Sequence, residues 1–132
     1  MPTNNTPVSL TARKRVAQRA SYICEYCLEQ DENSFIGFEI DHIISRKHKG
    51  SNDESNLAYT CPDCNRNKGT DIASIDWSSQ EIVRFFNPRT DIWAEHFRLS
   101  GGFIEPLTPI GKVTVDIFRF NDRVRLPDKD VF

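Results

Sequence analysis

The segment EIDHII, residues 39–44, places an acid and a histidine, Asp41 and His42, inside an apolar run of isoleucines. Neighbouring residues of a strand point to opposite faces, so we expect at least one of these two side chains to face a cleft. A carboxylate is a hard oxygen ligand for a divalent cation, and a neutral imidazole can take a proton from water. The pair is therefore suited to a metal-assisted reaction of water.

Two asparagines extend this set of polar residues. Asn56 ends the polar loop that follows the histidine, and Asn65 lies in CPDCNRNKG. That stretch has Pro62 near its first turn and Gly69 past its end, which predicts a short helix. An amide oxygen from this helix, together with the Asp41 carboxylate and waters, suits Mg²⁺ better than zinc.

All four cysteines occur in two CxxC pairs, CEYC and CPDC, formed by Cys24, Cys27, Cys61 and Cys64. The N-terminus has no charged region followed by an apolar one, so we expect neither secretion nor lasting disulfides. Each CxxC turn can direct two thiolates at one point, and two turns complete a tetrahedral zinc site of the structural type. A redox role is less favoured, because one pair would suffice and no βαβ pattern surrounds either pair. We therefore predict a structural Zn²⁺ that clamps residues 24–64 and contributes to folding.

Length and composition indicate one folded domain. The chain has 132 residues, 38% of them hydrophobic and 11% aromatic, and this length fits a single core. No apolar stretch approaches the roughly 20 residues of a membrane span, so we expect no membrane partner and a cytoplasmic protein. The net charge of −2 gives no bulk reason for nucleic-acid binding, although the basic residues are clustered.

The pattern of the first half predicts a helix from about Thr11 to Ala20, capped by Ser9 or Thr11. Its basic face is interpreted as ordinary solvated charge. A strand or hairpin is expected near residues 35–43, and NLAYT is expected to form a second short strand before the CPDCNRNKG helix.

The second half differs in composition, with seven of the nine Phe, both Trp and no Cys after Gly69. We expect the core to contain the following aromatic residues: Trp77, Phe85, Phe86, Trp93 and Phe97. In LTPIGKVTVDIFRFN, Thr108 as N-cap and Pro109 at the first position predict a helix, although residues 113–115 favour a strand.

The motifs CEYC, EIDHII and SNLAYTCPDCNRNKG together resemble an HNH endonuclease of the ββα-metal superfamily, in the subgroup framed by a four-cysteine zinc. The resemblance covers about residues 12–70, and residues 71–132 resemble the extension of small stand-alone bacterial HNH proteins. It implies an α+β fold in a single domain, residues 1–132. A zinc-stabilised ββα-metal core with an N-terminal helix would span residues 10–70, and a mixed α/β extension packed on it would span residues 71–132.

The resemblance also implies the role of each polar residue. The metal-binding acid falls on Asp41, the general base on His42, the orienting asparagine on Asn56 and the second metal ligand on Asn65. Many members have histidine at the last position, and the amide oxygen here favours Mg²⁺ or Mn²⁺ over softer metals. The implied reaction is one-metal hydrolysis of a phosphodiester bond that leaves 5'-phosphate and 3'-hydroxyl ends, with DNA favoured over RNA as the partner.

Five basic residues near the motif are candidate contacts to DNA phosphates: Arg46, Lys47, Lys49, Arg66 and Lys68. The alternative interpretation is that they are ordinary solvated surface charges. Double-strand cleavage would need a homodimer or two separate events. The alternative function is a zinc-framed nucleic-acid-binding or protein-interaction module without turnover. The polar set inside the zinc frame favours the nuclease, because a purely structural module does not need it.

Overall fold

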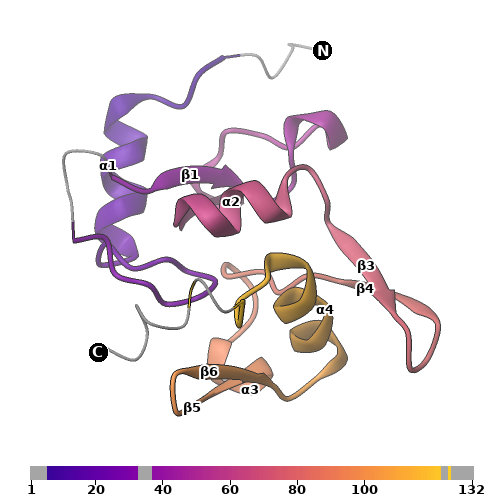
Figure 1. The fold of residues 1–132 in the computed structure, drawn as a ribbon. Coiled ribbons are helices and arrows are strands. Elements are labelled where there is room, and N and C mark those ends of the chain that lie inside the picture. Colours follow the sequence, from indigo (N-terminus) through magenta and orange to yellow (C-terminus); the bar gives the residue numbers. More distant parts are fainter. Residues whose placement is uncertain (1–5, 33–36, 123–124, 126–132) are drawn as a thin grey trace.

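The chain forms two groups of elements that follow each other along the sequence (Figure 1). The computed structural model describes residues 6–32, 37–122 and 125. The elements of the first group are the helix α1 (Leu10–Arg19), the strands β1 (Glu39–His42) and β2 (Leu57–Thr60), and the helix α2 (Pro62–Lys68). Two 3₁₀ turns, Arg46–His48 and Glu54–Asn56, lie in the loop between the strands.

The second group contains two hairpins and two helices. In chain order they are β3 (Ala73–Asp76), β4 (Glu81–Arg84), α3 (Trp93–His96), β5 (Phe97–Ser100), β6 (Phe103–Pro106) and α4 (Pro109–Phe118). Within the described residues, every sheet is an antiparallel pair: β1 with β2, β3 with β4, and β5 with β6. Helices combined with short antiparallel sheets make this an α+β protein, as the resemblance implies.

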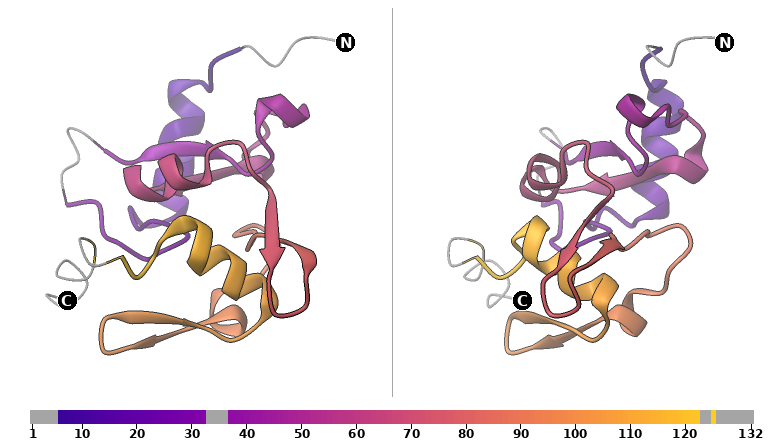
Figure 2. Two further views of the ribbon diagram at one scale, coloured as in Figure 1. Left: turned by 45° about the vertical axis from the view of Figure 1, so that its right-hand side comes forward. Right: turned by 90° about the vertical axis from the view of Figure 1, so that its right-hand side faces the viewer.

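The β1–β2 hairpin lies between α1 and α2 (Figure 2). His42 is paired with Leu57, and Asp41 with Ala58. Leu57 packs in a small core with Val16 and other residues of α1, whereas the opposite face of the hairpin meets α2. Because strand residues alternate, His42 lies on the α1 side and Asp41 on the α2 side.

The helix ends confirm the capping signals of the sequence. Ser9 accepts a hydrogen bond from the Ala12 amide at 3.1 Å, and Thr108 accepts one from the Gly111 amide at 3.0 Å. Pro109 then starts α4, which continues through residues 113–115. The strand preference of those residues is overridden because the cap and the apolar stripe both favour a helix.

The main core joins the two groups of elements. It contains the four cysteines and Tyr26 from the first group, with Phe85, Phe86, Phe97 and Phe118 from the second. Trp93 packs at its edge. The proposed division into residues 10–70 and 71–132 remains a prediction.

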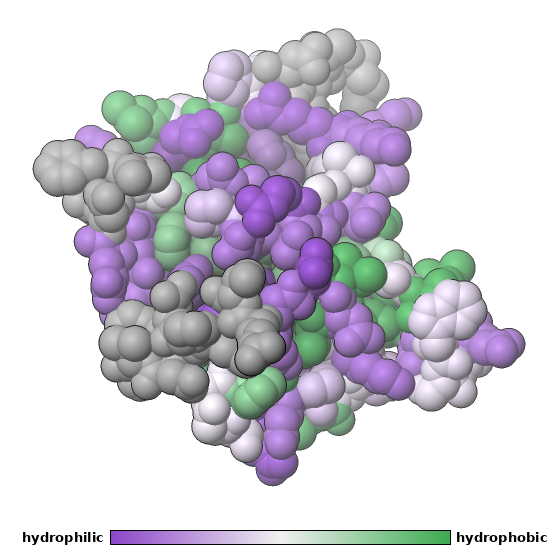
Figure 3. Space-filling model, in the orientation of Figure 1, coloured by the Kyte–Doolittle hydropathy of each residue, from purple (hydrophilic) through white to green (hydrophobic). Residues whose placement is uncertain are grey.

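The core expectation for Trp77 is wrong, since its side chain is 77% exposed. Trp77 begins the turn of the β3–β4 hairpin, which projects from the body of the molecule (Figure 1), and no helix or strand of the described residues covers it. Ile82 on the same hairpin is equally exposed. Apolar side chains accordingly gather at this hairpin on a face that is otherwise mostly hydrophilic (Figure 3).

The basic side chains of α1 are exposed, as expected, and two of them also contact the chain at the start of β2. Arg15 forms an ion pair with Glu54, its Nε lying 2.9 Å from Oε2. Arg19 donates to the carbonyl oxygens of Glu54 at 3.0 Å and Leu57 at 2.7 Å. These side chains tie α1 to the start of β2. No helix in the described part of the chain is long and apolar enough to cross a membrane.

Candidate metal centre and nuclease site

The four cysteines, Cys24, Cys27, Cys61 and Cys64, are buried together, and their Sγ atoms all lie within 4.8 Å of one another. Cys61 caps α2, and its Sγ accepts a hydrogen bond from the Cys64 amide at 3.4 Å. Burial raises the pKa of the Cys64 thiol well above its usual value, so thiolates in this cluster need a cation. Two CxxC turns that converge in this way fit a structural zinc with no open coordination position.

Asp41 faces α2 and is buried in an ion pair. Lys68 Nζ donates to Asp41 Oδ1 at 3.1 Å and to the His42 carbonyl oxygen at 2.9 Å. The Tyr26 hydroxyl donates to Asp41 Oδ2 at 3.1 Å. Burial raises the pKa of Asp41, while Lys68 and Tyr26 act in the opposite direction. Asp41 is only 4% exposed, so this acid lies behind the surface instead of lining an open cleft.

His42 lies on the other face of β1, where its ring contacts Asn52. The distance between His42 Nε2 and Asn52 Oδ1 is 2.8 Å. Asn52 Nδ2 donates to the Thr6 carbonyl oxygen at 2.7 Å, which fixes the orientation of the amide. Arg46 Nε also lies near this nitrogen, 3.5 Å from His42 Nε2. Since Asn52 Oδ1 can only accept and its contact is the shorter of the two, we assign the ring proton to Nε2, and the lone pair then lies on Nδ1.

Asn52 is the residue that sequence reasoning missed. The resemblance gave the orienting role to Asn56, four residues further along. Asn56 Oδ1 accepts from the Ile44 amide at 2.9 Å, and Nδ2 donates to the carbonyl oxygens of Ile44 at 3.0 Å and Ser51 at 2.8 Å. Asn56 therefore closes the loop after His42, whereas Asn52 contacts the ring itself. The only sequence signal was a second asparagine in the same polar stretch.

Asn65 projects from α2 toward β1 and donates from Nδ2 to the Glu39 carboxylate. Glu39 and Asp41 occupy the same face of β1, so α2 brings Asn65 to the first and Lys68 to the second. Carboxylate and amide oxygens on one face have the donor chemistry of a magnesium or manganese site. At Asp41, the Lys68 ammonium supplies the neutralising positive charge.

The basic candidates fall into three settings. Lys47 and Lys49 are exposed on the 3₁₀ turn after β1. Arg46 lies beside His42 and donates from Nη2 to the Thr6 carbonyl oxygen at 2.8 Å. Arg66 is exposed on α2 and pairs with Asp63 at 2.6 Å. Lys68 differs from the expected surface contact, because it is only 2% exposed and is paired with Asp41.

Gly50 is required by the close approach of the chain to Ile44. A Cβ atom at this position would lie 1.6 Å from the Ile44 carbonyl oxygen and 2.9 Å from Asn56 Nδ2. Gly50→Ala is therefore expected to force the loop open and to cost about 1–3 kcal/mol of unfolding free energy. Hydrogen exchange of the Ile44 amide should accelerate, since Asn56 would lose its position.

The control for this variant is Gly101→Ala, where nothing clashes with the added carbon and the strain of a φ of 55° falls in the turn between β5 and β6, away from Ile44. It should leave exchange at Ile44 unchanged. Equal protection of Ile44 in the Gly50 variant and the unaltered protein would contradict the proposed close contact.

A helix, a β-hairpin and a second helix, framed by four converging cysteines that could hold a metal ion, define a small ββα unit. Residues 24–71 match the family model described as HNH endonuclease. This match and the convergence of the four cysteines confirm the resemblance read from the sequence. The matched segment also contains Asp41, His42, Asn56 and Asn65, whose roles remain predictions. This match indicates a nuclease or nucleic-acid-binding role. Neither the curated proteins nor the solved structures gave a match to the chain.

Proposed function

We propose that the protein is a divalent-metal-dependent endonuclease that hydrolyses DNA phosphodiester bonds and leaves 5'-phosphate and 3'-hydroxyl ends. The observation that carries this proposal is the setting of His42. Asn52 Oδ1 lies 2.8 Å from His42 Nε2, and in the tautomer assigned above Nδ1 carries the lone pair that a general base needs. In this mechanism His42 takes a proton from the attacking water, and Asn56 maintains the loop that follows it.

Asp41 and Asn65 would hold the catalytic ion, for which Mg²⁺ or Mn²⁺ fits the oxygen donors best. They lie on the face of β1 opposite to His42, so the ion and the base would have to reach the same phosphate from the two sides of this strand. When bound, such an ion stabilises the charge that develops on the phosphate and on the leaving 3'-oxygen. The Lys68 ammonium lies at Asp41 Oδ1, so an ion at this oxygen would require the ammonium to move aside. Arg46, Lys47, Lys49 and Arg66 remain proposed contacts to DNA phosphates.

The test is cleavage of plasmid DNA and of defined oligonucleotides with Mg²⁺ or Mn²⁺. His42→Ala is expected to lower the rate by about 10²–10⁴-fold, because general-base assistance is lost. His48→Ala is the matched control, since this histidine is exposed on the adjacent turn. Zinc content and the circular dichroism spectrum should be the same in both variants. Equal cleavage by His42→Ala and His48→Ala would reject the proposed base.

The second candidate is a zinc-framed nucleic-acid-binding module without turnover. The buried Asp41–Lys68 pair favours it, because the Lys68 ammonium neutralises the Asp41 carboxylate without a metal ion. A zinc-loaded protein that binds DNA but cleaves no duplex, single strand or RNA across a panel of divalent metals would support this candidate over the nuclease.

A further inference from the structure

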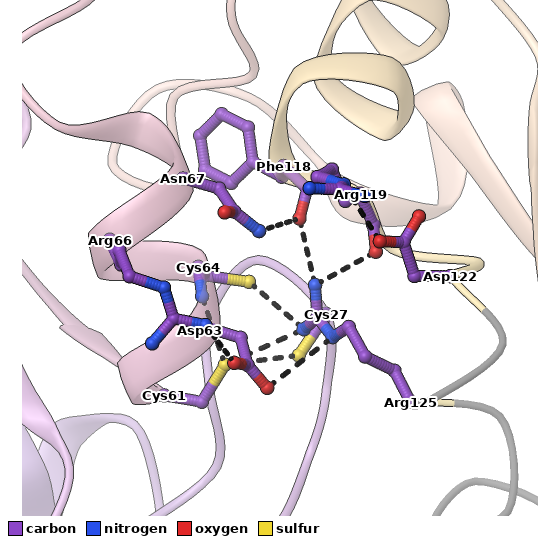
Figure 4. A network of polar contacts seen from close by, with 10 residues as sticks. All are labelled: Cys27, Cys61, Asp63, Cys64, Arg66, Asn67, Phe118, Arg119, Asp122 and Arg125. Atoms are coloured by element: carbon purple, nitrogen blue, oxygen red, sulfur yellow. Dashed lines mark hydrogen bonds and ion pairs between the residues drawn. The ribbon is translucent and has the colours of Figure 1, made fainter.

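Arg125 places a guanidinium against the cysteine cluster. Its Nη2 atom donates to Cys64 Sγ at 3.4 Å and to Cys61 Sγ at 3.6 Å. The residue is only 5% exposed. Figure 4 shows its side chain lying between the end of α4 and the cysteines of the CPDC turn. An arginine from the far end of the described chain therefore completes the surroundings of the predicted zinc.

The same guanidinium also binds the C-terminal end of α4. Arg125 Nη1 donates to the carbonyl oxygens of Phe118 at 2.8 Å and Arg119 at 3.1 Å. Carbonyl groups in the last turn of a helix lack partners within the helix and carry partial negative charge. Asn67 of α2 donates to the same Phe118 oxygen at 2.9 Å. One cation thus links α4 to the helix that carries two of the cysteines.

A buried guanidinium is costly unless negative charge compensates it. The Asp63 carboxylate lies 3.8 Å from Arg125 Nε, beyond hydrogen-bond distance, and its side chain is 39% exposed and also paired with Arg66. Nε itself has no hydrogen-bond partner among the described residues. The groups that accept from the guanidinium at the cluster are the two sulfur atoms. Four thiolates around one Zn²⁺ carry a net charge of −2, which is the compensation this position needs.

We propose that Arg125 is a positioning residue for the zinc cluster, acting as the counter-ion of the zinc–thiolate centre and coupling zinc loading to the docking of α4. Hydrogen bonds from N–H groups lower the electron density on thiolate sulfur and offset the excess negative charge of the four-thiolate centre. The metal is thereby retained longer, and the end of α4 is fixed next to α2. This inference concerns the zinc and does not depend on nuclease activity.

The test compares Arg125→Met with Arg119→Met in the zinc-loaded full chain. Arg119 is a matched control because it caps the same helix, while its side chain is exposed and pairs with Asp122. Zinc transfer to a chromogenic chelator is expected to be about 10–100-fold faster in Arg125→Met, as is typical when a partner of a metal ligand is lost. Arg119→Met should match the unaltered protein.

Replacement of zinc by Co²⁺ supplies a readout that a purely packing role would not change. The thiolate-to-cobalt charge-transfer bands should shift in Arg125→Met, since the N–H···S bonds are lost, and should stay in place in Arg119→Met. Should Arg125→Met fail to fold with excess zinc, Arg125→Lys decides: faster zinc transfer together with shifted bands supports the proposal. Unchanged transfer rates and bands in the folded Arg125 variant would overturn it.

Discussion

Removal of zinc is expected to abolish the cooperative fold of the whole chain. The cysteines belong to the same core as Tyr26 and Phe118, so their separation would break the packing of both groups of elements. Structural zinc contributes apparent binding free energies of about 10–16 kcal/mol in small domains. The whole free energy of unfolding of a typical protein is about 5–15 kcal/mol, so loss of the metal can remove all of it. Near-ultraviolet circular dichroism and urea unfolding, with and without a chelator, measure this effect.

Cys24→Ser should reproduce the effect of the chelator even when zinc is present. Val16→Thr is the control, because it also introduces a hydroxyl at a fully buried position but lies in the separate core next to α1. That variant should lose only about 1–3 kcal/mol. A chelated protein that keeps its near-ultraviolet spectrum and its sharp unfolding transition would show that the cysteines do not hold the fold through a metal.

Lys68→Met is expected to destabilise the protein by about 3–5 kcal/mol near neutral pH, because it leaves the buried Asp41 carboxylate without its cation. The ammonium and the carboxylate are both almost fully buried and lie 3.1 Å apart. Urea unfolding at constant zinc, with no other divalent metal added, measures the loss. The double variant Asp41→Asn/Lys68→Met should recover much of it, since no buried charge remains.

The pH dependence of the Lys68→Met deficit follows from Asp41. Burial already raises the pKa of this carboxyl, and loss of Lys68 removes the main opposing influence. A raised folded-state pKa costs stability only where the unfolded chain is ionised, which for Asp begins near pH 4. The loss of stability in Lys68→Met should therefore be small below about pH 4 and should grow as the pH rises. It should level off above the pKa that Asp41 has in the folded variant. A deficit that shrinks with rising pH would contradict this assignment.

Added Mg²⁺ or Mn²⁺ should stabilise Lys68→Met more than the unaltered protein, because an ion at Asp41 would no longer compete with the ammonium. The double variant provides the baseline, since it lacks the carboxylate. If added Mg²⁺ or Mn²⁺ stabilises all three proteins equally, Asp41 is not a ligand of the proposed catalytic ion.

Local signals predicted much of the fold. Ser9 and Thr108 were readable as caps because capping depends on neighbours three residues away. The CxxC spacing likewise restricts where two thiols can point, so the cysteine cluster was predictable. The Asp41–Lys68 pair joins residues 27 positions apart, and it depends on how α2 lies across β1. The position of α2 relative to β1 is fixed by tertiary packing, so no local sequence pattern predicts it.

Trp77 shows the same limit for the core. Its large apolar side chain suggested burial, but exposure is decided by whether another element covers the β3–β4 turn. Asn52 and Asn56 cannot be distinguished by composition either, since both are asparagines in one polar loop. Only the folded loop reveals that Asn52 reaches the histidine ring and Asn56 the backbone.

The carbonyl oxygen of Thr6 accepts hydrogen bonds from two side chains that contact His42, namely Arg46 and Asn52. Position 6 thus contributes to the surroundings of the histidine through its backbone, which any amino acid could supply. Substitutions there would be tolerated as long as the path of the chain is kept. Because this contribution comes from the backbone, no sequence motif would include position 6. Comparisons based on residue identity would therefore not detect that the proposed base, His42, depends on this segment.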